Sequence, residues 1–81
     1  MGELTAHTVI RWADWTIGPD VTPEAPAVDF AMRCTTCGAS SGADEVFETA
    51  RDWAFRHLGR NPSHTAFREI IHRPWRATLV R

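Results

Sequence analysis

Hydrophobic residues change their spacing several times along the chain, and each spacing predicts a different element. Residues 8–17 are rich in β-branched and aromatic side chains, with Trp15 and Ile17 on one phase of the alternation and Ile10 and Trp12 on the other. Such a run is typical of a β-strand. We therefore expect one strand here, with apolar groups on both of its faces.

A loop and a second strand are predicted next. Residues 18–26 contain three prolines, which have no amide hydrogen to continue a ladder, so this stretch is expected to be a proline-rich loop. Within residues 27–33, Val28, Phe30 and Met32 alternate with small or charged residues, the pattern of a strand with one buried face. The next residue on the buried phase is a cysteine, so its sulfur should leave the strand on the core side.

Helical spacing follows in the middle of the chain. Serines and acids at residues 40–45 favour a helix start, because they suit the cap and the first turn. Apolar residues then recur every three or four positions up to Leu58, and His57 lies on this stripe. Residues 65–72 and 75–80 regain the pattern of strands, with Pro74 between them as a bulge, an edge position or a turn.

These elements predict an α+β fold in which one helix packs over a small antiparallel sheet, a ββαβ-like zinc knuckle. The 81 residues should form a single domain, 1–81, with residues 1–7 frayed. A chain this short buries only about 60–65% of its unfolded surface, so its core alone gives little stability. Small domains of this kind usually need a disulfide or a metal.

Two cysteines and two histidines offer such a metal site. Cys34 and Cys37 form a Cys-x-x-Cys turn followed by Gly38, and His57 and His64 follow about twenty residues later. These are four ligands of the types that bind Zn²⁺, the number that a closed tetrahedral site requires. The six residues between the histidines exceed the usual three to five, so His64 is expected to lie beyond the helix. We predict one structural zinc ion per chain.

Other interpretations of these residues stay open. The cysteines can instead form a disulfide or a redox pair, or remain free thiols in a reducing cytoplasm. A redox pair normally opens a helix after a strand in a parallel α/β unit, and no such unit is predicted. His7 and His72 are the competing histidines, but the first lies in the stretch expected to fray and the second in a late strand.

Charge divides the chain unequally although the net charge is only −1. Residues 1–33 hold five acids against two arginines, a balance of −3, whereas residues 51–81 hold seven arginines against two acids, a balance of +5. All nine basic residues are arginine, which suggests a GC-rich genome. No signal peptide or membrane span is expected, so we place the protein in the cytoplasm.

Several segments together resemble a known family. The runs at 15–20, 34–38 and 61–64, with Trp53-Ala54 before the first ligand histidine and Phe67 after the second, are similar to a family of small, functionally uncharacterised proteins of actinobacteria such as Streptomyces. The resemblance spans nearly the whole chain. It implies a cytoplasmic zinc-finger-like protein whose ligands are the two cysteines and two histidines, with Trp53 and Phe67 in the core.

Function is expected to be binding and not catalysis. Four good ligands leave no open coordination position, and the helix has neither a His-Glu-x-x-His motif nor the motif of nucleotide deaminases. The first hypothesis is a protein-interaction module or homodimer that uses Trp12 and Trp75. The alternative is a nucleic-acid-binding adaptor that contacts phosphates through C-terminal arginines, namely Arg56, Arg60, Arg68, Arg73 and Arg76.

Overall fold

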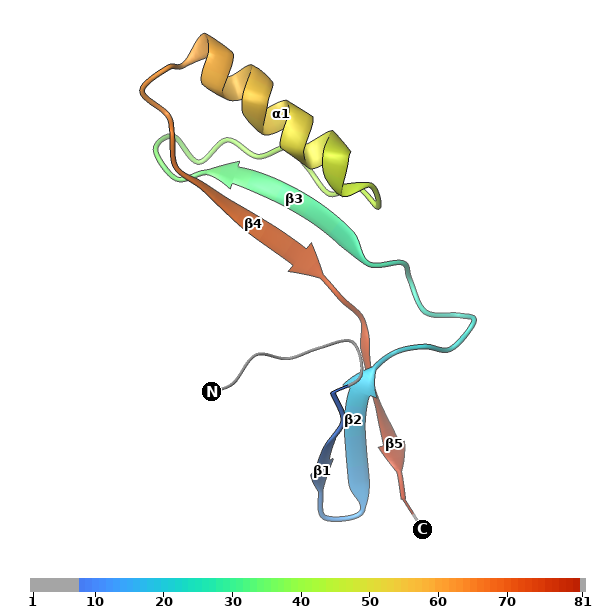
Figure 1. Cartoon of the computed structure of the whole chain (residues 1–81). Coiled ribbons are helices and arrows are strands. Elements are labelled where there is room, and N and C mark those ends of the chain that lie inside the picture. The colour runs from blue at the N-terminus through green and yellow to red at the C-terminus, as the bar shows by residue number, and fades with distance from the viewer. Residues whose placement is uncertain (1–7, 81) are drawn as a thin grey trace. The chain divides into compact units, whose positions relative to one another are not determined.

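One helix and five strands form within residues 8–80, the part of the chain that the computed structural model describes (Figure 1). The strands span Ile10–Trp12 (β1), Trp15–Pro19 (β2), Asp29–Cys34 (β3), Phe67–His72 (β4) and Trp75–Leu79 (β5), and the helix spans Phe47–Arg60 (α1). All strand pairs are antiparallel, which confirms the α+β class. The predicted fraying of residues 1–7, and with it His7, lies outside the described residues.

The strands form two sheets, whereas the sequence led us to expect one. The first sheet has the order β1-β2-β5 and the second pairs β3 with β4. Each belongs to a compact unit of its own. We call residues 8–27 with 73–80 the terminal unit, and Val28–His72 the helical unit. The helix of the described part is not long and apolar enough to cross a membrane.

A hairpin replaces the single strand that was predicted over residues 8–17. Ala13 and Asp14 form a two-residue turn, with Ala13 at a φ of 55° in the left-handed region. The turn folds the two halves of the run onto each other, so that Trp12 lies opposite Trp15. Opposed residues share a face of the sheet, so the prediction that Ile10 and Trp12 lie on the opposite face from Trp15 and Ile17 was wrong.

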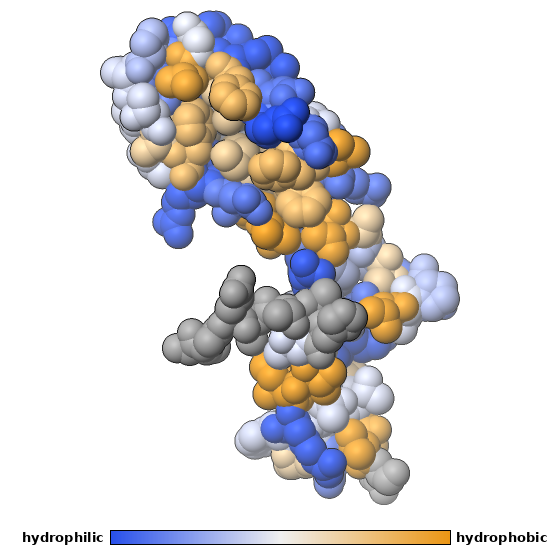
Figure 2. Space-filling model, in the orientation of Figure 1, coloured by the Kyte–Doolittle hydropathy of each residue, from blue (hydrophilic) through white to orange (hydrophobic). Residues whose placement is uncertain are grey.

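Register gives the terminal unit one apolar and one polar face. Side chains opposed across the two ladders place eight residues on the apolar face: Ile10, Trp12, Trp15, Ile17, Pro19, Trp75, Ala77 and Leu79. The opposite face carries Arg11, Thr16, Gly18, Arg76 and Thr78. Hydrophobic side chains are visible at the surface over β1, β2 and β5 (Figure 2).

A half-buried residue, Asp20, has a carboxylate that organises one end of this sheet. Asp20 accepts a 3.1 Å ion-pair contact from Arg76 and bonds from the amide and hydroxyl groups of Thr22. The Arg76 guanidinium, followed by the Thr22 donors, lowers the pKa of Asp20 to about 2.

The loop predicted over residues 18–26 begins later than expected, because Gly18 and Pro19 still belong to β2.

In the helical unit, β3 is bordered on both sides. Its six residues pair in register with β4, from Asp29 opposite His72 to Cys34 opposite Phe67. Along its other edge, residues 39–44 run antiparallel and exchange backbone hydrogen bonds with it. The predicted helix start at residues 40–45 was wrong, because these residues pair with the strand, and α1 begins at Phe47 after Val46.

The helix packs its short side chains against the sheet. Ala50, Ala54 and His57 are the buried residues of α1, and Cys34, on the face of β3 toward the helix, is buried beneath them. Small residues let the helix backbone approach the strand closely. An aromatic contact then fills the space at the start of the helix. A Phe30–Phe47 edge contact closes one end, with ring centroids 5.9 Å apart.

Candidate metal centre

Cys34 and Cys37 lie on a tight knuckle at the end of β3. The amide of Gly38 donates to the carbonyl of Cys34, and the amide of Cys34 donates to the carbonyl of Ala39. Both hydrogen bonds have a donor–acceptor distance of 2.8 Å. This curl requires Gly38 at a φ of +79°, which a residue without a Cβ adopts at little cost. Cys34 is fully buried and Cys37 is exposed, so the knuckle presents one sulfur from the core and one from the surface.

His57 comes from the last turn of α1 and is held by aromatic neighbours. Its ring stacks on Trp53, one turn earlier, with centroids 4.9 Å apart and an interplanar angle of 18°. Phe67 meets the same ring edge to face at 6.1 Å. Because these contacts fix the ring plane, His57 directs Nε2 toward the knuckle without depending on a hydrogen bond from another side chain.

His64 returns to the site through a turn. Asn61 ends the helix, where its amide and its side-chain Nδ2 both donate to the carbonyl of His57 at 2.9 and 3.0 Å. The carbonyl of Asn61 then accepts the amide of His64 at 2.8 Å, with Pro62 in the first central position of the turn. The second histidine thus lies outside the helix, and the six residues between the histidines are the end of the helix, Leu58 to Arg60, and the start of this turn, Asn61 to Ser63.

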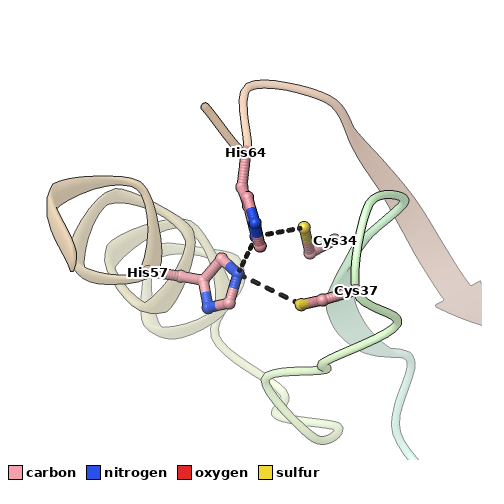
Figure 3. Close-up of side chains that lie close together, drawn as sticks. All are labelled: Cys34, Cys37, His57 and His64. Carbon is pink, nitrogen blue, oxygen red and sulfur yellow. Dashed lines mark hydrogen bonds between the residues drawn. The ribbon is translucent and has the colours of Figure 1, made fainter. Parts of the chain in front are cut away.

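The four side chains converge on one point (Figure 3). Their ligand atoms all lie within 4.8 Å of one another. Cys34 Sγ is 3.6 Å from His64 Nδ1, Cys37 Sγ is 3.5 Å from His57 Nε2, and the two nitrogens are 3.3 Å apart. Two sulfurs and two nitrogens at these separations can hold one metal ion between them.

The knuckle also favours the thiolate form of Cys34. Burial of the sulfur opposes ionisation, but backbone hydrogen bonds from Cys37 and Thr36 outweigh it and hold the pKa of Cys34 below its ordinary value. A thiolate is the form that binds metal. The backbone of the turn therefore prepares the buried sulfur as a ligand.

Other residues nominated from the sequence lie elsewhere. His72 ends β4 and contacts Asp29, with 2.6 Å between Nδ1 and Oδ1. His72 lies five residues beyond Phe67, roughly 16 Å along the strand, and is therefore not part of the ligand cluster. The five nominated arginines divide between the units, with Arg73 and Arg76 in the terminal unit and the other three in the helical unit. Both nominated tryptophans, Trp12 and Trp75, belong to the apolar face.

Two residues that shape the site were not assigned these roles from the sequence. Trp53 had been placed only in the core, although its four-residue spacing from His57 is the signal for a stacked pair on a helix. Asn61 was included only in the run 61–64 that resembles the family. Asparagine is favoured both at the end of a helix and at the start of a turn, and this preference was the signal for its role between His57 and His64.

Comparison with known proteins places the chain in a family but gives no activity. No curated protein matches the chain. No solved structure matches it either. A family model described as a domain of unknown function, DUF7848, matches residues 4–81, nearly the full length and including all four ligand residues. The chain belongs to this family.

Proposed function

We propose that this protein is a structural zinc protein that acts as a protein-interaction module. The geometry of the four ligands supports zinc. Tetrahedral zinc with bonds of about 2.3 Å to sulfur and 2.0–2.1 Å to nitrogen sets the ligand atoms about 3.6 Å apart for a sulfur–nitrogen pair and about 3.3 Å for two nitrogens. Two of the sulfur–nitrogen separations here are 3.6 and 3.5 Å, the two nitrogens are 3.3 Å apart, and all six separations are within 4.8 Å.

The same ligand set favours a structural role for the metal. Two thiolates and two imidazoles complete a tetrahedral shell, which leaves no position for a water molecule or a substrate. Binding and not catalysis is therefore the function we propose. The arginine-only basic composition suits an actinobacterial origin, and zinc-bound thiolates suit the reducing cytoplasm.

The observation that supports an interaction role is the apolar face of the β1-β2-β5 sheet. Trp12 is 78% exposed and Trp15 is 46% exposed, although each lies directly opposite the other. Ile10, Ile17 and Leu79 on the same face are also exposed. A monomeric protein seldom leaves so many large hydrophobic side chains together in water without a partner.

A second copy of the chain is the partner we propose for this face. An aromatic side chain carries roughly 150–250 Å² of surface, so the exposed parts of these five side chains come to on the order of 500 Å². Two such faces packed together would bury about 1,000 Å², near the lower bound for a specific interface. A two-fold pair is self-complementary here because both faces are apolar.

Native mass spectrometry tests both halves of this proposal in one measurement. We expect a dimer with one zinc ion per chain at micromolar protein concentration. Trp12→Ser should give a monomer that still carries its zinc, because the substitution removes the most exposed aromatic side chain of the face. Arg11→Ser, on the neighbouring residue of β1 but on the polar face, is the matched control and should remain dimeric.

A wild-type chain that stays monomeric at this concentration would contradict the dimer. A dimer that Trp12→Ser leaves intact would contradict the assigned face. Well under half an equivalent of zinc in a folded, unchelated preparation would contradict the metal. The three results are independent, so each part of the proposal stands or falls alone.

Nucleic-acid binding is the second candidate, favoured by the +5 balance of residues 51–81. Four neutralised phosphates would give a log–log salt slope of about −3 to −4 for duplex DNA. We expect weak or no binding at physiological ionic strength, because Arg76 is already paired with Asp20 and the N-terminal part is acidic. Sub-micromolar, salt-sensitive binding in a gel-shift titration would reverse this order of the two functions.

A further inference from the structure

Two arginines face each other on the side of the β3-β4 sheet that α1 does not cover. Arg33 of β3 lies directly opposite Arg68 of β4. The neighbouring pair, Cys34 and Phe67, points to the helix, since Phe67 contacts the ring of His57. Side chains alternate along a strand, so both arginines project from the opposite face.

The Arg33–Arg68 pair destabilises the sheet when no counter-ion is present. Like charges directly opposite each other in an antiparallel ladder are destabilising. Within residues 8–80, neither guanidinium has an ion pair or hydrogen bond: the three ion pairs join Arg51 to Asp52, Arg76 to Asp20 and His72 to Asp29. The acid on the same face, Asp29, is thus held by His72. Two charges remain without a counter-ion in the described part.

A cavity lies beside these two arginines. Its volume is about 340 Å³, and its walls are Arg33, Cys34, Thr35, Gly38 and Arg68. A Cβ on Gly38 would lie 3.6 Å from Nη2 of Arg33, an ordinary van der Waals distance, so that guanidinium lies beside the knuckle backbone. The Thr35 hydroxyl donates to the carbonyl of Ala66, which leaves the guanidinium N–H groups as the free donors of the cavity.

We infer that this cavity binds the phosphate group of a small phosphorylated molecule between Arg33 and Arg68. A guanidinium presents its N–H groups in a fork that fits two phosphate oxygens, and two forks match the double charge of a phosphate monoester. The volume falls in the range of small-molecule sites and exceeds the phosphate, so it can also admit part of the group to which the phosphate is attached. The site is separate from the proposed dimer face, which lies in the other unit.

The test uses the full-length, zinc-loaded protein with inorganic phosphate and adenosine monophosphate as probes, followed by calorimetry and by the Nε–Hε signals of the arginines. We expect both probes to bind, to shift the Arg33 and Arg68 signals, and to raise the thermal midpoint. Arg68→Met should weaken binding about tenfold or more by removing charged hydrogen bonds. Arg60→Met, which removes an arginine of α1 outside the cavity, is the matched control and should bind as the wild type does.

A second readout separates a binding role from a structural one. Without any probe and at low salt, Arg68→Met should melt no lower than the wild type, because it relieves a like-charge contact. Equal loss of binding in Arg60→Met and Arg68→Met, or a lower melting point of Arg68→Met without probe, would overturn the inference. Acetate that binds as tightly as phosphate, or duplex DNA that binds while both small probes fail, would overturn the assigned ligand.

Discussion

Replacing Cys37 with serine is expected to release the metal ion and to unfold the helical unit. Cys37 is exposed, so the substitution removes a ligand atom with little loss of packing. The core that would remain is small, since the buried apolar residues in the described part are Ala31, Cys34, Ala50 and Ala54. Structural zinc contributes roughly 10–16 kcal/mol of apparent binding free energy in finger peptides, as much as the whole stability of an ordinary domain.

The measurements are metal content and far-ultraviolet circular dichroism, before and after a chelator is added. Cys34→Ser and His57→Ala should give the same loss of helix, although both also remove buried packing. His72→Ala is the control, because His72 contacts Asp29 and lies outside the ligand cluster. A Cys37→Ser variant that keeps a wild-type helical spectrum without metal would show that the fold does not depend on the ion.

Acidification is expected to remove the metal and the helix in one transition. Protons compete with the metal for both thiolates and both imidazoles, so metal affinity falls as the pH falls. The pKa of Cys34 is lowered in the folded chain, chiefly by backbone hydrogen bonds that outweigh the effect of burial. A group with a lowered pKa contributes stability above its ordinary pKa and loses it as the pH falls through the folded value.

Because protons compete with the metal for its ligands, stability and metal content should decline together as the pH falls below neutrality. Circular dichroism and bound zinc, measured over the same pH series, should give overlapping midpoints. Returning the pH to neutrality in the presence of zinc should restore both. Zinc that leaves at a pH where the circular dichroism is unchanged would mean that the metal is peripheral to the fold.

The ligand set could be predicted from the sequence because its geometry is local. Cys34 continues the buried phase of its strand, Gly38 permits the curl after Cys37, and His57 lies on the apolar stripe of the helix. Each of these signals spans only a few residues. The return of His64 was predictable for the same reason, since Pro62 follows the helix end.

The hairpin of β1 and β2 could not be predicted, because its turn has no strong signal. Ala13 and Asp14 replace the Asn-Gly or Asp-Gly pairs that usually mark a two-residue hairpin. Ala13 adopts a positive φ, which few alanines do, so the hairpin depends on pairing across the strands and not on local preference. Residues 40–45 misled the prediction in a similar way, because a serine and acids suit a helix cap as well as an extended edge.

Metal binding in the helical unit also affects the β1-β2-β5 sheet, because the helical unit lies between β2 and β5 in the chain. Strands β2 and β5 pair from Pro19 opposite Trp75, so residues 20–74 occupy the place of a hairpin loop. The helical unit begins and ends within that loop, and its first and last paired residues, Asp29 and His72, are partners in one ladder. Once folded, it shortens the effective loop from 55 residues to about eleven, which lowers the closure cost by about 1.5 kcal/mol. The helical unit thus takes the place of a turn between β2 and β5, and metal loading makes the apolar face of the β1-β2-β5 sheet easier to assemble.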